Sequence, residues 1–148
     1  MFGRSDVEVA KALTRIARKY QLTEFMLIHS LYALLLSRHS NSRDIVVGVP
    51  IANRKREEWT TLIGFFVNTL VLRVDTHHQD LADYLAHVRQ VHIDAQANQD
   101  IPFEQLVELL QVTPSTANTP LFQIVLTSNA DYGVSQNGDK RPCFFGVP

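Results

Sequence analysis

The side-chain amide at position 68 is the first group in this sequence whose placement could serve chemistry. Asn68 stands in "IGFFVNTLVLRVD" (residues 63–75), a stretch that is otherwise mostly apolar and has the composition of a β-strand. Alternate side chains share a strand face, so Asn68 is predicted to lie beside Leu70, with Thr69 on the other face. A buried amide without a partner costs about 1–3 kcal/mol. Asn68 must therefore bind either neighbouring backbone, the commoner partner, or a polar group of a ligand.

The histidines and the cysteine give no comparable indication of a functional site. His87 and His92 are five residues apart on a predicted helix with no third ligand in sight, so no metal site is predicted. The pair at residues 77–78 is followed by Asp80, which we interpret as a helix cap after a solvated loop rather than as a catalytic group. Cys143 has no base nearby, so we do not expect it to act as a nucleophile. No glycine-rich phosphate loop is present.

Composition narrows the class of protein. The chain has 148 residues with 14 Lys and Arg against 15 Asp and Glu, and this balance provides no basic stripe for nucleic acid. A single cysteine excludes an internal disulfide. No apolar run is long enough to span a membrane, and the first residues, "MFGRSDVEVA", lack a secretory signal. We expect one cytoplasmic domain with partners other than nucleic acid or membrane.

Two helices and a strand are predicted in the first third of the chain. Ser5 and Glu8 have the spacing of a capping box at a helix start. Thr23 is a second candidate cap. The helix that follows Thr23 has an apolar stripe at spacings of three and four. That stripe consists of Phe25, Ile28, Leu31, Tyr32 and Leu35. Turn residues then lead into a β-branched strand over residues 45–49.

The rest of the chain continues this alternation. After a charged loop at residues 52–61, the strand containing Asn68 has two largely apolar faces, as in a sheet covered on both sides. Asp80 caps a long helix, residues 103–110 form a short one and residues 120–127 a further strand. The buried face of the long helix is predicted to hold Leu81, Tyr84, Leu85, Val88 and His92. This order of elements indicates an α/β fold with helices packed against a sheet.

Four segments, in order and with matching spacing, resemble the C-terminal motifs of condensation domains from nonribosomal peptide synthetases. They are "VGVPIANR" (residues 47–54), "IGFFVNTLVLR" (63–73), "NQDIPFEQLVELL" (98–110) and "TPLFQIVL" (119–126). The resemblance covers about residues 5–127. It implies a chloramphenicol-acetyltransferase-like, CoA-dependent-acyltransferase-like fold made of two α/β halves around a tunnel. Residues 1–128 resemble the C-terminal half only, a two-layer sandwich of helices on a mixed β-sheet, and residues 129–148 are expected to be an irregular tail.

The resemblance also implies an activity and partners. Condensation domains join aminoacyl or peptidyl groups carried on the phosphopantetheine arms of carrier proteins, and an amide bond forms. The expected partners are these carrier proteins, an adjacent adenylation domain and the missing N-terminal condensation subdomain. No cofactor is expected to bind the chain itself.

The catalytic signature of the family, His-His-x-x-x-Asp-Gly, is absent from the sequence. None of the six histidines is followed by an aspartate four residues later. The family signature lies in the N-terminal half, so the chain is predicted to contain no catalytic residue and to be inactive alone. The missing half would belong to another polypeptide or to an upstream stretch, as for a fragment or the product of a displaced start, or the chain would be a truncated, inactive copy. The Arg and Asp that usually precede the last motif are also missing from "TPSTANTPLFQ".

Two sets of site residues follow from the matched motifs. The first set is expected to line the substrate channel and consists of Asn68, Thr69 and Arg54. Arg54 is equally well explained as part of a solvated, mixed-charge loop. The second set is expected to shape the backbone and consists of Gly64, Asn98, Gln99, Asp100 and Pro102. Within it, Asp100 is the predicted N-cap of the short helix and Pro102 lies in its first turn.

Two other functions remain open. The chain could be a non-catalytic module that docks a carrier protein, or part of another carrier- or CoA-dependent acyltransferase of the same fold. In every case an isolated half leaves an apolar surface where its mate belongs, so we expect poor solubility or self-association.

Overall fold

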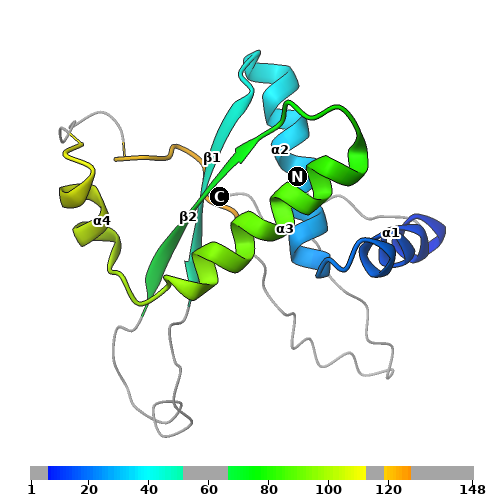
Figure 1. Ribbon diagram of the computed structural model, residues 1–148, viewed down its shortest axis with the longest axis horizontal. Helices are drawn as coiled ribbons and strands as arrows, with labels where there is room; N and C mark the ends of the chain where they lie inside the picture. The colour runs from blue at the N-terminus through cyan, green and yellow to red at the C-terminus, as the bar shows by residue number, and fades with distance from the viewer. Residues whose placement is uncertain (1–6, 52–66, 113–118, 128–148) are drawn as a thin grey trace, which may run out of the picture.

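The computed structural model describes residues 7–51, 67–112 and 119–127. Figure 1 shows a pair of strands at the centre, with α2 and α3 on one side and α4 on the other, and α1 beyond α2. The elements in chain order are α1 (Val7–Lys19), α2 (Glu24–Ser40), β1 (Asp44–Ile51), β2 (Asn68–Asp75), α3 (Leu81–Ala97) and α4 (Phe103–Leu109). The α/β class predicted from the sequence is confirmed. None of these helices combines the length and the apolar character that crossing a membrane requires.

Two predicted helix caps are confirmed. The Thr23 hydroxyl accepts a hydrogen bond from the Met26 amide at 3.1 Å, and α2 follows it. One Asp80 carboxylate oxygen accepts from the Asp83 amide at 2.8 Å, and α3 begins at the next residue. Each oxygen satisfies an amide that has no partner within its helix. The proposed cap at Ser5 lies outside the described residues.

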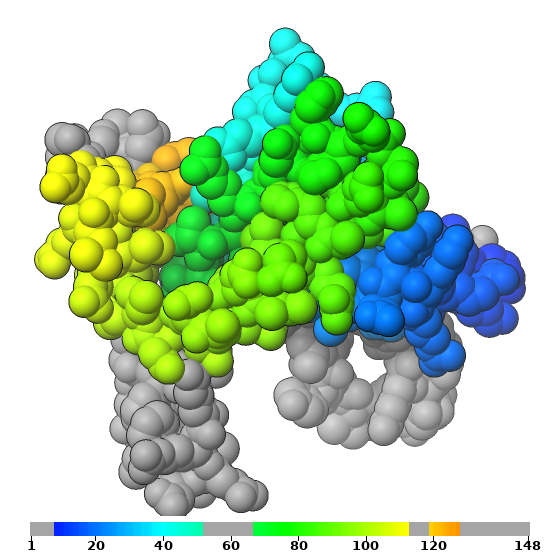
Figure 2. Space-filling model, viewed as in Figure 1, coloured from blue at the N-terminus to red at the C-terminus, as the bar shows by residue number. Residues whose placement is uncertain are grey.

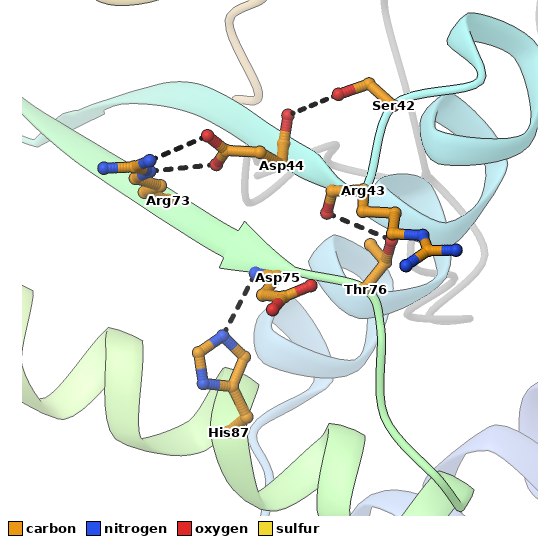
Figure 3. Close-up of polar contacts among 7 residues, drawn as sticks. All are labelled: Ser42, Arg43, Asp44, Arg73, Asp75, Thr76 and His87. Atoms are coloured by element: carbon orange, nitrogen blue, oxygen red, sulfur yellow. Dashed lines mark hydrogen bonds and ion pairs between the residues drawn. The ribbon is translucent and has the colours of Figure 1, made fainter.

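The two strands are antiparallel, with Val47 opposite Leu72. One face of the pair is buried against α2 and α3. The buried strand residues on that face are Ile45, Val47, Val49, Leu72 and Val74. The other face is open at one end, where the exposed Arg73 guanidinium donates to both carboxylate oxygens of Asp44 at 2.9 and 2.8 Å (Figure 3). The expectation that the Asn68 strand is covered on both faces is therefore wrong at this end.

The strand predicted over residues 120–127 is wrong in extent. Within residues 119–127, which the structure describes, only Val125 pairs with β1, in a parallel bridge to Gly48. The Gly48 amide donates to the Ile124 carbonyl and the Leu126 amide donates to the Gly48 carbonyl, both at 2.9 Å. The preceding residues cannot extend the pairing, because Pro120 lacks an amide hydrogen and Leu121 has a left-handed φ of 69°. β1 thus has an antiparallel neighbour on one edge and a short parallel one on the other.

The apolar stripe predicted on α2 is only partly buried: Phe25 and Tyr32 pack against the core, but the prediction is wrong for Leu31 and Leu35. Leu31 and Leu35 are 46% and 53% exposed, whereas His29 and Ser30 are completely buried. The helix carries apolar residues on every side, so their spacing alone cannot select a face. In α3 the prediction is confirmed for four of its residues and wrong for Leu81, which is exposed in the first turn.

Candidate functional site

The Asn68 side chain makes four hydrogen bonds to backbone groups. Its Nδ2 group donates to the carbonyl oxygens of Gln99 and Ile101, both at 2.9 Å. Its Oδ1 atom accepts from the amide of Thr69 at 2.9 Å and from the amide of Phe103 at 3.1 Å. A carboxamide has two donor hydrogens and two acceptor lone pairs, so this one is saturated. The structure thus supplies the backbone partners that were one of the two alternatives for this amide.

The start of α4 differs from the prediction. The N-cap residue is Pro102, with an extended backbone, and it makes no side-chain cap bond. The prediction of Asp100 as N-cap is therefore wrong, because such a cap requires the helix to begin at Ile101 and it begins at Phe103. The Phe103 amide, which has no acceptor within the helix, instead donates to Asn68 on β2. The cap comes from a residue 35 positions earlier in the chain.

Asn98 and Gln99 lie at the start of the connection from α3 to α4. Asn98 is the C-cap of α3, and both its backbone amide and its Nδ2 group donate to the Asp94 carbonyl, at 3.2 and 2.8 Å. The next carbonyl, that of Gln99, accepts from Asn68. The connection from α3 to α4 is thus tied to the end of α3 at one point and to the start of β2 at the other.

Aromatic packing joins α4 to the strands. The ring of Phe103 lies 5.5 Å from that of Phe122, centroid to centroid. The Phe122 ring in turn covers Gly48, where an added Cβ would stand 2.5 Å from a ring carbon. Glycine is therefore required at position 48 for this close approach. We call the region formed by Asn68, Thr69, residues 98–103 and the Phe103–Phe122 pair the β2–α4 corner. In Figure 2 the yellow atoms of α4 lie beside the orange atoms of residues 119–127, at one side of the molecule.

The other predicted channel residues divide between described and undescribed parts of the chain. Thr69 is half-buried and lies opposite Pro50 in the strand pair. Arg54 and Gly64 fall outside the described residues. The assignment of Asn68, Thr69 and Arg54 to a substrate channel stays a prediction.

A buried pair of histidines joins α2 to α3. Nδ1 of His29 and Nε2 of His92 are 2.9 Å apart, and the two residues are 0% and 4% exposed. The Phe25 ring packs edge-on against His92 with centroids 5.8 Å apart. Burial lowers the pKa of His92 to about 4, and burial together with the neighbouring His92 lowers the pKa of His29 to about 4. Both rings are therefore neutral near pH 7, and one donates to the other.

Sequence reasoning missed this pair because the two histidines are 63 residues apart. The available signal was that His92 falls within the apolar stripe of α3, where a polar group needs a partner. The pair leaves Nε2 of His29 without a hydrogen-bond partner among the described residues.

One of the two histidines that follow β2 is less exposed than predicted. His77 is exposed, but the His78 ring lies 4.9 Å from that of His87 and 5.8 Å from that of Tyr84, and its Nε2 atom is buried. The Asp75 amide donates to Nε2 of His87 at 3.2 Å (Figure 3). Burial and His78 lower the pKa of His87, partly opposed by Asp75. The expectation of a solvated loop is thus wrong for His78. Over residues 7–51, 67–112 and 119–127, no three His, Cys, Asp or Glu side chains are placed to share a metal ion.

Sequence relatives are peptide synthetases. The chain is 46% identical over 123 residues to malpibaldin synthetase of Mortierella alpina and 44% identical over 124 residues to a dimodular nonribosomal peptide synthase of Bacillus subtilis. These alignments take in 82% and 83% of this chain but 2% and 5% of the two relatives. The chain therefore spans a small part of the length of the curated relatives it matches.

Solved structures similar to this chain also include a peptide synthetase and a condensation domain. A four-domain nonribosomal peptide synthetase, holo-AB3403 bound to AMP and glycine, superposes with a TM-score of 0.84 at 27% identity, covering 90% of this chain and 10% of that chain. The condensation domain from the monacolin K polyketide synthase MokA superposes with a TM-score of 0.74 at 28% identity, covering 84% of this chain and 30% of that chain. The profile of the family described as "Condensation domain" matches residues 3–142. With nearly its whole length inside that match, the chain belongs to the condensation domain family.

Proposed function

We propose that the chain is the C-terminal subdomain of a condensation domain from a nonribosomal peptide synthetase. The proposal is supported by the coverages against MokA, in which 84% of this chain accounts for only 30% of that chain, and by the order of the four motifs, which resemble the C-terminal ones of the family. On this proposal residues 1–128 form a two-layer sandwich of helices on a mixed sheet, with the acyltransferase-like topology of the family. Residues 129–148 then form the tail that follows it.

The proposed reaction is amide formation between two carrier-bound substrates. The acceptor amine attacks the donor thioester carbon, the new C–N bond forms as the C–S bond breaks, and the thiol leaves with the proton. Both substrates arrive on phosphopantetheine arms of carrier proteins, one of them loaded by an adenylation domain. In this scheme Asn68, Thr69 and Arg54 belong to the channel side of the subdomain.

Three of the described histidines support the proposal that the catalytic base lies in the other subdomain. His29 and His92 are buried and bonded to each other, and His87 accepts a backbone amide. Nδ1 of His29, Nε2 of His92 and Nε2 of His87 are therefore already used in hydrogen bonds within the chain. We propose that the proton acceptor comes from the N-terminal subdomain and that this chain alone forms no amide.

The surface favours a permanent partner over a free-standing role. Several large apolar side chains in and next to α2 and α4 are exposed within the described ranges. They are Leu31, Leu35, Leu109 and Leu110. Leu31 and Leu35 lie one turn apart on α2, and Leu109 and Leu110 are adjacent at the end of α4, so each pair is a small apolar surface that a partner could cover. Such surfaces are expected whether the chain binds a missing subdomain or acts as a docking module. The two functions differ in whether amide formation depends on this chain.

A chimera separates the two functions. Residues 7–127 replace the matching segment of the dimodular synthase of Bacillus subtilis, and the hybrid is assayed with that enzyme's own loaded carrier proteins. The proposal predicts dipeptide formation at a measurable fraction of the parental rate. Its controls are the parental enzyme and a hybrid in which the host's own catalytic histidine is replaced, which should be inactive. A folded hybrid that binds both carriers and forms no dipeptide would support the docking module instead.

A further inference from the structure

We propose that Asn68 is a positioning residue: its side chain sets the place of α4 relative to β2 and makes no direct contact with substrate. The consequence for amide formation rests on the proposed function. The assignment differs from the channel contact that the motif alone implies for this residue, and it follows from four hydrogen bonds in the β2–α4 corner.

The Asn68 carboxamide has no hydrogen-bonding capacity left for a ligand. Both Nδ2 hydrogens are donated to carbonyl oxygens of residues 99 and 101, and Oδ1 accepts two amides. A substrate group could bind this carboxamide only by displacing one of the four backbone partners. Displacement would leave a backbone donor or acceptor unsatisfied in a half-buried place, which opposes such binding.

α4 contributes no buried residue to the core. The helix has seven residues. A helix this short has no independent stability in water, so contacts with the rest of the protein must hold it in place. Among the described residues, these contacts include the Asn68 bonds at its first turn and the packing of Phe103 on Phe122.

Asn68 occupies the first position of β2, opposite Ile51. Its backbone is fixed by the strand pair, while its side chain reaches across to the connection between α3 and α4. One residue therefore links three elements: the strand, the end of α3 through residue 99, and the start of α4 through Phe103. Loss of the side chain should release the connection without removing anything from the apolar core between the sheet and α2.

Amide hydrogen exchange on the full chain tests the structural half of the proposal. Asn68→Ala removes all four bonds, and Asn68→Asp keeps the side-chain shape and the acceptor while removing both donors. Each variant should raise the exchange rates of the Phe103 and Leu106 amides by roughly tenfold or more, while amides of α2 and β1 change by less than about twofold. Gln105→Glu is the matched control, because it makes the same charge change at an exposed position of α4 and should leave these rates unaltered.

Kinetics of the chimera with the dimodular synthase test the functional half. Asn68→Asp should lower kcat about fivefold or more with KM for the loaded carriers unchanged within about twofold, since the amide has no free group with which to bind them. Unchanged exchange at Phe103 and Leu106 in both variants overturns the proposal. A raised KM with normal exchange also overturns it, because that is the pattern of direct substrate contact. If the chimera with native Asn68 forms no dipeptide, the proposed function fails while the exchange comparison still decides the role of Asn68.

Discussion

Different kinds of interaction stabilise the two sides of the strand pair. On the side of α2 and α3, apolar side chains from both helices and both strands are buried together, and Val47, Leu72 and Val88 are at most 1% exposed. On the side of α4, no residue of that helix is buried, and the described attachment includes the Asn68 hydrogen bonds, a pair of aromatic rings and the close approach at Gly48. The first side derives its stability from buried area, whereas the second depends on a few specific contacts.

This difference predicts which changes act globally and which act locally. Removing apolar volume from the α2–α3 side should lower the free energy of unfolding of the whole domain. Removing a contact from the α4 side should loosen that side and leave the rest folded. Four sets of substitutions, taken from the largest expected effect to the smallest, test this contrast.

Leu72→Ala should have the largest effect. The side chain is 1% exposed at the centre of the buried face, so its loss should leave a cavity and lower the free energy of unfolding by about 2–5 kcal/mol. Urea denaturation followed by circular dichroism measures this. Val125→Ala is the control on the other side, where the residue is 53% exposed and the expected loss is below about 0.5 kcal/mol. Similar losses for the two variants would contradict the proposed asymmetry.

Acid should weaken the α2–α3 side through His29 and His92. The folded-state pKa of each is about 4, below the ordinary 6.5, so the unfolded chain binds protons more readily and stability falls as pH drops from about 6.5 towards 4. For His29, a pKa of about 4 in place of 6.5 corresponds to a loss of stability of about 3 kcal/mol at low pH. Urea denaturation at a series of pH values tests this. In the double variant His29→Leu/His92→Phe the fall over this range should largely disappear, and a fall of the same size there would assign it to other groups.

Gly48→Ala should lower the free energy of unfolding by disturbing the packing on the α4 side. The new Cβ would stand 2.5 Å from the Phe122 ring, so the ring must move and the pairing of residues 124–126 with β1 must shift. Overpacking of this kind costs about 1–3 kcal/mol. Adding Phe122→Leu, which shortens the obstructing side chain, should recover part of the loss in a double-mutant cycle. Strictly additive effects of the two substitutions would show that the ring is not the obstacle.

Arg73→Ala should have the smallest effect. Its guanidinium lowers the pKa of the Asp44 carboxyl through a two-point hydrogen bond (Figure 3), but the side chains are 74% and 53% exposed. Exposed pairs of this kind add little to stability and weaken with added salt, because water and ions screen the two charges. Urea denaturation at low and high salt measures the contribution. A loss as large as that of Gly48→Ala that persists in high salt would mean that the open end of the sheet is less solvated than its exposure indicates.

Sequence reasoning succeeded where the cause is local. The caps at Thr23 and Asp80 depend on atoms three residues away, and both were predictable from residue type and position. Reasoning failed where several solutions satisfy the same local pattern. The α2 stripe is one case, because a helix that is apolar on every side buries whichever face meets its neighbours. Asp100 is another, because its residue type suits a cap that the structure takes from Asn68 instead.

The sequence by itself determined the class of fold, the helix starts at Thr23 and Asp80 and, through its ordered motifs, the family to which the chain belongs. Only the tertiary structure decided what Asn68 binds, which face of α2 is buried and why position 48 is glycine. Those answers depend on groups far apart in the sequence, such as Asn68 with Phe103, His29 with His92 and Gly48 with Phe122. Spacing along a chain reports the neighbours within one helix or strand, whereas contacts between elements are selected by the packing of the whole domain.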